Sequence, residues 1–136
     1  MRHTTLEQMQ TPISSIGFGA MSFSDFYGPT DDEKSFSILD RCMDLGITHL
    51  DTSNVYGLGL SERRIGDYLE SRGQQARDFF TIATKAGIAS KPNGSRYFDN
   101  SPEHLRNELD GSLQRLGVEQ VELLYVHRRD ASVPIE

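Results

Sequence analysis

Short apolar segments of strand character alternate with amphipathic helical segments along most of the chain. The strand segments are residues 13–18, 47–50, 79–84 and 121–126, and the helical segments begin near residues 30, 61 and 101. This unit recurs about every 30 to 40 residues, the length of a strand, a loop and a helix. Because strands that run in parallel are joined by crossover helices, this order predicts an α/β protein with a parallel sheet.

Start and stop signals mark the helical segments. Residues 30–33, Thr-Asp-Asp-Glu, have the form of a capping box, Ser61 is the expected cap of the second helix, and Pro102 fits the first turn of the third. Gly46 and Gly117 follow the first and third helices as left-handed terminators. The expected buried faces are Phe36, Leu39, Cys42 and Met43, then Ile65, Tyr68 and Leu69, then Leu105, Leu109, Leu113 and Leu116.

A parallel sheet of this kind either stays open and doubly wound or closes into a β/α barrel. An open sheet that binds a dinucleotide requires Gly-x-Gly-x-x-Gly after a strand. Residues 17–22 and 57–62 each begin with Gly-x-Gly but lack the third glycine, which weakens the open-sheet interpretation. In a barrel, the chain would supply an N-terminal hairpin around residues 4–10 and roughly the first four β/α units, with residues 86–100 as a loop.

The composition, with 36% hydrophobic and 25% charged residues, is that of an ordinary globular protein. Its 136 residues predict one domain, residues 1–136. The net charge of −6 gives no support for a nucleic acid or an anionic membrane as partner, and the sequence has neither a membrane-spanning apolar stretch nor a signal peptide. Cys42 is the only cysteine, which excludes an internal disulfide and a multi-cysteine metal site, so we predict no metal. A cytoplasmic protein is expected.

Four polar side chains stand directly after the predicted strands or in the loops that follow them. Asp51 and Tyr56 follow the second strand, Lys85 follows the third and His127 follows the fourth. In a β/α barrel all these positions lie on the rim formed by the carboxyl ends of the strands, where active sites are built. An acid, a phenol, an amine and an imidazole are therefore expected to converge.

Each of these residues alone also has a purely structural interpretation. Asp51 fits a turn residue, Tyr56 a packed amphipathic ring, Lys85 a solvated charge and His127 a hydrogen-bonded structural histidine. Their joint placement at strand ends favours a catalytic interpretation instead. A lysine ammonium favours the phenolate form of a neighbouring tyrosine, a carboxylate keeps that lysine charged and oriented, and an imidazole donates a hydrogen bond to a substrate oxygen that gains negative charge.

Four segments of the chain resemble the aldo-keto reductase family. Residues 51–62, Asp-Thr-Ser-Asn-Val-Tyr-Gly-Leu-Gly-Leu-Ser-Glu, resemble the family signature of Asp-Thr, Tyr-Gly and Gly-x-Ser-Glu. Residues 83–87, Ala-Thr-Lys-Ala-Gly, are similar to the lysine segment of the third strand, and residues 125–130, Tyr-Val-His-Arg-Arg-Asp, to the histidine segment of the fourth. Residues 15–21, Ser-Ile-Gly-Phe-Gly-Ala-Met, resemble the first-strand motif that lies against the cofactor.

The resemblance implies a (β/α)8 barrel that transfers a hydride from NADPH to an aldehyde or a ketone. By this analogy Tyr56 is the proton donor, Lys85 and Asp51 tune it, and His127 orients the carbonyl. The same analogy places residues near the nicotinamide ribose, namely Gly19, Ala20, Met21 and Asp51. The substrate is expected to be a small carbonyl compound of unknown identity.

The length of the chain sets a second expectation, because a (β/α)8 barrel requires about 250 residues. Four parallel strands leave two unpaired edges, so we expect the remainder of the barrel or a second chain as a partner. The 136 residues alone are expected to bind NADPH weakly and to have little activity. Two alternatives remain at this stage: an inactive half-barrel fragment, and a non-catalytic reductase-like binding or regulatory subunit.

Overall fold

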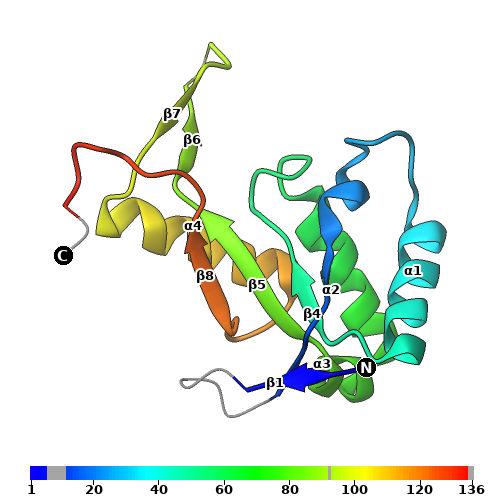
Figure 1. The fold of residues 1–136 in the computed structure, drawn as a ribbon. Helices are drawn as coiled ribbons and strands as arrows, with labels where there is room; N and C mark the ends of the chain where they lie inside the picture. The colour runs from blue at the N-terminus through cyan, green and yellow to red at the C-terminus, as the bar shows by residue number, and fades with distance from the viewer. Residues whose placement is uncertain (6–11, 92, 135–136) are drawn as a thin grey trace.

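A parallel sheet of four strands is the centre of the structure, a computed structural model that describes residues 1–5, 12–91 and 93–134 (Figure 1). The strands run in the order β3 (Gly17–Gly19), β4 (His49–Asp51), β5 (Thr81–Ala86) and β8 (Leu123–Val126). All three strand pairs are parallel, so the four carboxyl ends lie at one edge of the sheet. The predicted α/β alternation and parallel sheet are confirmed.

Helices connect these strands and cover one face of the sheet. They are α1 (Asp32–Leu45), α2 (Leu60–Arg72), the short α3 (Gln74–Phe79) and α4 (Pro102–Leu116), and the 3-10 helix η1 (Ala20–Ser24) follows β3. The hydrophobic core lies between the helices and the sheet and includes Leu39, Leu50, Ile65, Tyr68, Ile82 and Leu116. Among the described residues, no helix has the length and the apolar character needed to cross a membrane.

The first helix begins one residue later than the capping box predicts. Asp31, not Thr30, is the cap: its backbone is extended, and its carboxylate accepts a hydrogen bond from the Lys34 N–H. Thr30 is engaged elsewhere, since its N–H donates to Asp25 and its carbonyl accepts from Arg64. The predicted buried face and the left-handed terminator Gly46 are confirmed.

Ser61 does not cap the second helix, contrary to the prediction. The cap position is Gly59, which adopts the left-handed conformation with φ 83° and has no side chain that could cap the helix. The Ser61 hydroxyl lies 2.9 Å from that of Thr52 and donates to the carbonyl of Ala20 at 2.8 Å. It thereby joins the loops that follow β3 and β4, and Ile65, Tyr68 and Leu69 are buried as predicted.

Three short elements, one helix and two strands, were not predicted from the sequence. Residue 79, expected to start the third strand, is the last residue of α3, and β5 begins at Thr81. The prediction missed α3 because a six-residue helix is too short to show helical periodicity. Residues 86–100, expected to be a loop, contain a hairpin in which β6 (Ile88–Ser90) pairs antiparallel with β7 (Arg96–Phe98). Figure 1 shows this hairpin projecting from the end of β5.

The N-terminal segment also differs in detail from the prediction. Residues 13–18 do not form one strand: β2 (Ile13–Ser14) pairs antiparallel with β1 (His3–Thr4), and β3 then joins the parallel sheet. The Ser14 hydroxyl causes the break, because it accepts from the Thr48 N–H and donates to the Ile16 carbonyl. The part of the predicted hairpin at residues 6–10 lies outside the described residues.

The leucine stripe of α4 is covered only in part. The cap Ser101, the first-turn Pro102 and the terminator Gly117 are confirmed, but only the last leucine of the stripe, Leu116, is fully buried. The other three leucines, at positions 105, 109 and 113, are half-buried. Helix α4 packs against α2 and β5, and β8 is the edge of the sheet, so part of this helix face has no neighbour among the described residues.

A buried ion pair joins α2, β5 and α4. The side chain of Glu62 is fully buried, and its carboxylate accepts hydrogen bonds from Arg115 Nε at 2.6 Å and from the Thr84 hydroxyl at 2.6 Å. The two helices approach closely at Gly66, where an added Cβ would lie 2.3 Å from the carbonyl oxygen of Arg115. The ion pair and the glycine together fix the distance between α2 and α4.

We predict that Gly66→Ala destabilises the chain by about 2 kcal/mol, because the added methyl group forces the backbones of two helices apart. The matched control is Gly111→Ala in α4, where the added Cβ meets only the flexible end of the Arg115 side chain at 3.1 Å. That control should be neutral or more stable by up to about 1 kcal/mol, as expected from helix propensity. Urea denaturation of both variants provides the measurement, and equal midpoints would contradict the proposed close packing.

Candidate active site

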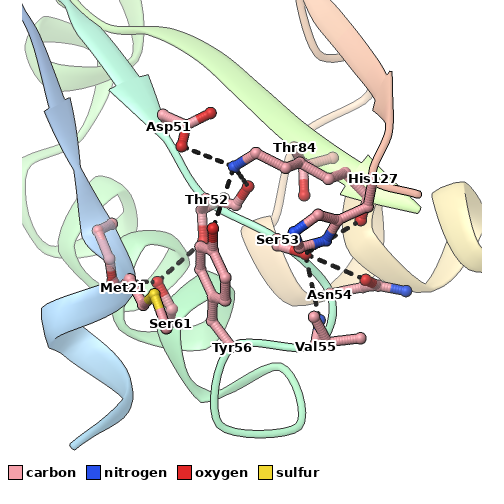
Figure 2. A network of polar contacts seen from close by, with 12 residues as sticks. Met21, Asp51, Thr52, Ser53, Asn54, Val55, Tyr56, Ser61, Thr84 and His127 are labelled. Carbon is pink, nitrogen blue, oxygen red and sulfur yellow. Dashed lines mark hydrogen bonds and ion pairs between the residues drawn. The ribbon is translucent and has the colours of Figure 1, made fainter. Parts of the chain in front are cut away.

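Asp51 and Lys85 meet at the carboxyl end of the sheet. Asp51 is the last residue of β4 and pairs with Ala83 on β5, and Lys85 lies two residues further along β5 on the same face. Lys85 Nζ donates to Asp51 Oδ2 at 2.6 Å and to the Thr52 carbonyl at 2.9 Å (Figure 2). The Lys85 side chain is only 15% exposed, so its charge is held largely out of water beside a carboxylate.

The loop after β4 brings Tyr56 to the same ammonium group. Backbone hydrogen bonds tie this loop to β5, from the Thr52 N–H to the Ala83 carbonyl and from the Asn54 N–H to the Lys85 carbonyl. The Tyr56 hydroxyl then lies 3.3 Å from Lys85 Nζ, and the ammonium lies 5.0 Å from the centre of the Tyr56 ring. The structure therefore places the predicted acid, amine and phenol in one continuous chain of contacts.

His127 completes the group from the fourth strand. It directly follows β8, and its N–H donates to the Ala86 carbonyl at 2.8 Å, which continues the pairing of β8 with β5. Its ring stands edge-on to Tyr56, with the ring centres 5.9 Å apart and the planes at 86°. His127 Nδ1 lies 3.0 Å from the Ser53 hydroxyl, and within the described residues Nε2 has no hydrogen-bond partner.

Ser53 and Thr52 are site residues that the sequence analysis did not single out. Ser53 is fully buried and holds the His127 ring, and Thr52, also fully buried, offers its carbonyl to Lys85. Both lie between Asp51 and Tyr56 within the segment that carries the resemblance. The sequence shows that both residues lie in the segment after the second strand. It does not show which groups the Ser53 hydroxyl and the Thr52 carbonyl contact, because those partners are set by the fold of the loop.

The surroundings of His127 favour its neutral form. Burial lowers the pKa of His127 below its ordinary value of 6.5, and the positive charges of Lys85, Arg128 and Arg96 lower the pKa further, against the opposing effect of Asp51. A neutral imidazole carries one N–H and one unprotonated nitrogen. The ring at neutral pH therefore acts as a hydrogen-bonding group without adding a positive charge to the site.

The residues predicted to lie against a nicotinamide cofactor are close to Asp51. Gly19 is in register with Asp51, and its backbone, with φ −88°, is a conformation open to any residue. A Cβ added at Gly19 would meet no described atom within 4 Å, so neither packing nor backbone geometry requires glycine there. Space for a ligand remains beside Gly19, and the second carboxylate oxygen of Asp51 has no partner among the described residues. These features fit a ribose placed over the end of β3 and β4.

The other two predicted cofactor residues differ in what they can offer. The Ala20 side chain is buried in the core and its carbonyl accepts from Ser61, so it faces away from any ligand. Met21 is half-buried and lines a cleft of about 710 Å³ that also contains Tyr56 and His127. The cleft is bordered on its other side by Phe98 of the β6–β7 hairpin.

A family model of the Aldo/keto reductase family matches residues 15–136. The chain belongs to this family. Among curated relatives it is 38% identical over 125 residues to "Aldo-keto reductase yakc [NADP(+)]" of Schizosaccharomyces pombe, covering 91% of this chain and 36% of that protein. It is 34% identical over 134 residues to a D-threo-aldose 1-dehydrogenase of a Pseudomonas species, covering 85% of this chain and 40% of the relative. The chain thus spans about two fifths of the length of these relatives.

Solved aldo-keto reductase structures confirm the predicted fold. A putative aldo-keto reductase from Pseudomonas aeruginosa aligns with a TM-score of 0.79 and 34% identity, over 95% of this chain and 48% of that structure. The holo form of an aldo-keto reductase from Bacillus halodurans aligns with a TM-score of 0.82 and 31% identity, over 99% and 43%. The chain has the fold of the N-terminal half of an aldo-keto reductase barrel, and the open doubly wound sheet is excluded.

We predict that His127 of the chain titrates below pH 6.5 when its ring protons are followed by NMR. Arg128→Gln should raise the pKa of His127 toward the ordinary value, because it removes one of the positive charges that lower it. Arg129→Gln is the matched control, since Arg129 is not among those charges, and should leave the titration unchanged. Because the unfolded chain binds this proton more readily, the associated stability is complete above pH 6.5 and is lost as the pH falls below it. A His127 titration at or above 6.5 would contradict this arrangement.

Proposed function

We propose that the chain provides the proton-transfer machinery of an NADPH-dependent reductase that converts an aldehyde or a ketone to an alcohol. The observation that carries this proposal is the position of Lys85, whose ammonium contacts Asp51 and the Tyr56 hydroxyl at the same time. A phenol is a weak acid, and an adjacent ammonium stabilises the phenolate that remains when the proton leaves. Membership of the family supports an oxidoreductase activity of the completed barrel.

In this mechanism Tyr56 gives its hydroxyl proton to the carbonyl oxygen of the substrate. Lys85 stabilises the phenolate that forms, and Asp51 keeps the ammonium charged and fixed in position. Proton transfer from a placed acid of this kind contributes about a hundredfold to ten-thousandfold in rate. In the oxidation of an alcohol the same phenolate takes the proton back, which fits a family that includes a relative named as a dehydrogenase.

His127 orients the carbonyl in this proposal. When the Ser53 hydroxyl donates to Nδ1, its shortest contact at 3.0 Å, the ring proton lies on Nε2. Nε2 then donates a hydrogen bond to the carbonyl oxygen as negative charge develops there. A neutral ring is sufficient for this role, in agreement with the lowered pKa of His127.

When bound, NADPH supplies the hydride that the carbonyl carbon accepts. The residues proposed to hold its nicotinamide ribose are Asp51, Gly19 and Met21. The preference for the phosphorylated cofactor is proposed from the relative in Schizosaccharomyces pombe, whose name specifies NADP(+). The phosphate-binding residues are expected in the part of the barrel that this chain does not contain.

We further propose that residues 1–136 act as one domain together with the remaining strands of a barrel, from a longer polypeptide or from a second chain. Strands β3 and β8 are the two edges of the sheet, and parallel strands can be added to both. On the β8 side Tyr125 is 41% exposed and Val126 is 53% exposed, as expected of a strand whose neighbour is supplied from elsewhere.

Tyr56→Phe in the completed barrel should lower carbonyl reduction by roughly a hundredfold or more while NADPH binding, followed by fluorescence, is retained. Tyr97→Phe is the matched control, because Tyr97 is exposed and is not among the residues that line the cleft. Unchanged reduction by Tyr56→Phe would contradict Tyr56 as the acid. A completed barrel that binds NADPH but reduces no aldehyde or ketone would support the non-catalytic alternative.

A further inference from the structure

The cleft above Tyr56 and His127 has a positive charge that the rest of the chain does not share. Two arginines line it, Arg96 from β7 and Arg128 from the segment after β8, and none of its lining residues is Asp or Glu. The chain as a whole carries a net charge of −6. A cleft lined by two arginines and by no acidic side chain, in a chain with a net negative charge, is suited to bind an anion.

These two arginines are also without ion-pair partners inside the described part of the chain. Neither takes part in any of the ion pairs there, and neither guanidinium makes a hydrogen bond. Of the nine other arginines, four are paired with carboxylates, namely Arg41, Arg64, Arg72 and Arg115, and the remaining five make no ion pair among the described residues. Arg96 and Arg128 are therefore free to bind a ligand at no cost of breaking an existing ion pair.

The hairpin geometry turns Arg96 toward the cleft together with an apolar wall. Arg96 and Phe98 are two residues apart on β7, so their side chains leave the same face, and Ile88 lies opposite Phe98 on β6. All three line the cleft, whereas Tyr97 points to the other face, where Lys91 lies 5.8 Å from its ring centre.

Arg128 is held in place by its backbone. Its carbonyl accepts a hydrogen bond from Asn100 Nδ2 at 3.1 Å, and the Asn100 side chain also accepts from the Asp130 N–H. Asn100 follows the β6–β7 hairpin, so this contact fixes Arg128 relative to the strand that carries Arg96.

We propose that the carbonyl substrate bears a carboxylate, which Arg96 and Arg128 bind, and an apolar or aromatic body that packs against Met21, Phe26 and Phe98. This inference rests on the proposed function, because it names the substrate class of the same site. The planar guanidinium group matches a carboxylate with two parallel hydrogen bonds. Both arginines lie close enough for their charges to lower the pKa of His127, which lines the same cleft.

The kinetic test compares two substrates of the completed barrel, 4-carboxybenzaldehyde and its uncharged methyl ester. We expect kcat/KM for the acid to exceed that for the ester by roughly tenfold, the size of a charge-assisted hydrogen bond. In the double variant Arg96→Gln/Arg128→Gln this ratio should fall toward one, whereas Arg129→Gln, whose side chain does not line the cleft, should keep it. Raising the salt concentration should also reduce the ratio in the unmodified protein.

The outcomes separate this inference from the proposed function. Reduction of both aldehydes without preference, or with a preference that the double variant retains, overturns the inference and leaves the reductase standing. A double variant that raises KM for NADPH and leaves the substrate ratio unchanged assigns the arginines to the cofactor phosphates and also overturns it. Failure to reduce either aldehyde overturns the proposed function itself.

Binding without catalysis provides a second measurement. Benzoate placed between the arginines adds a negative charge near His127 and should raise the pKa of His127 in an NMR titration, while benzamide should not. The shift should disappear in the double variant and persist in Arg129→Gln. A His127 pKa that benzoate leaves unchanged would contradict the anion site whatever the catalytic result.

Discussion

The buried carboxylate of Glu62 is the interaction on which the rest of the structure depends. A charge removed from water must be met by partners of opposite charge and by hydrogen bonds, and Glu62 receives both, from Arg115 and from Thr84. Thr84 and Lys85 are neighbours on β5 and point to opposite faces. Strand β5 is therefore held on one face by the Glu62 carboxylate and on the other by Asp51. This double attachment fixes Lys85 at the carboxyl end of the sheet.

From that fixed point the site is assembled by short loops. The loop after β4 is hydrogen-bonded to the backbone of β5 through Thr52 and Asn54. The same loop brings the Tyr56 hydroxyl to the Lys85 ammonium and the Ser53 hydroxyl to the His127 ring. Ser61, at the start of α2, joins this loop to the segment after β3. Side chains from three strands thus share one hydrogen-bonded framework, as Figure 2 shows.

The features that sequence could predict are those repeated in every β/α unit. Asp51 ends β4, Lys85 is the last residue but one of β5 and His127 follows β8, and strand ends are visible as boundaries of apolar segments. The features it could not predict are decided by distant contacts. Arg64 occupies the carbonyl of Thr30, and the cap of α1 lies at Asp31 instead. Helix α3 and the β6–β7 hairpin are too short for periodicity to reveal. Three leucines of α4, at positions 105, 109 and 113, are only half-buried, because nothing among the described residues covers the rest of their surface.

The attachment of the β6–β7 hairpin has an evolutionary consequence. Its base is closed by the hydrogen bond from the Asp99 N–H to the Gly87 carbonyl, and Asn100 ties the outgoing strand to Arg128. Insertions, deletions or substitutions between Gly87 and Asp99 are therefore expected to leave the positions of Lys85 and His127 unchanged. A lineage could therefore remodel the wall of the cleft while the arrangement of Asp51, Tyr56, Lys85 and His127 stays unaltered.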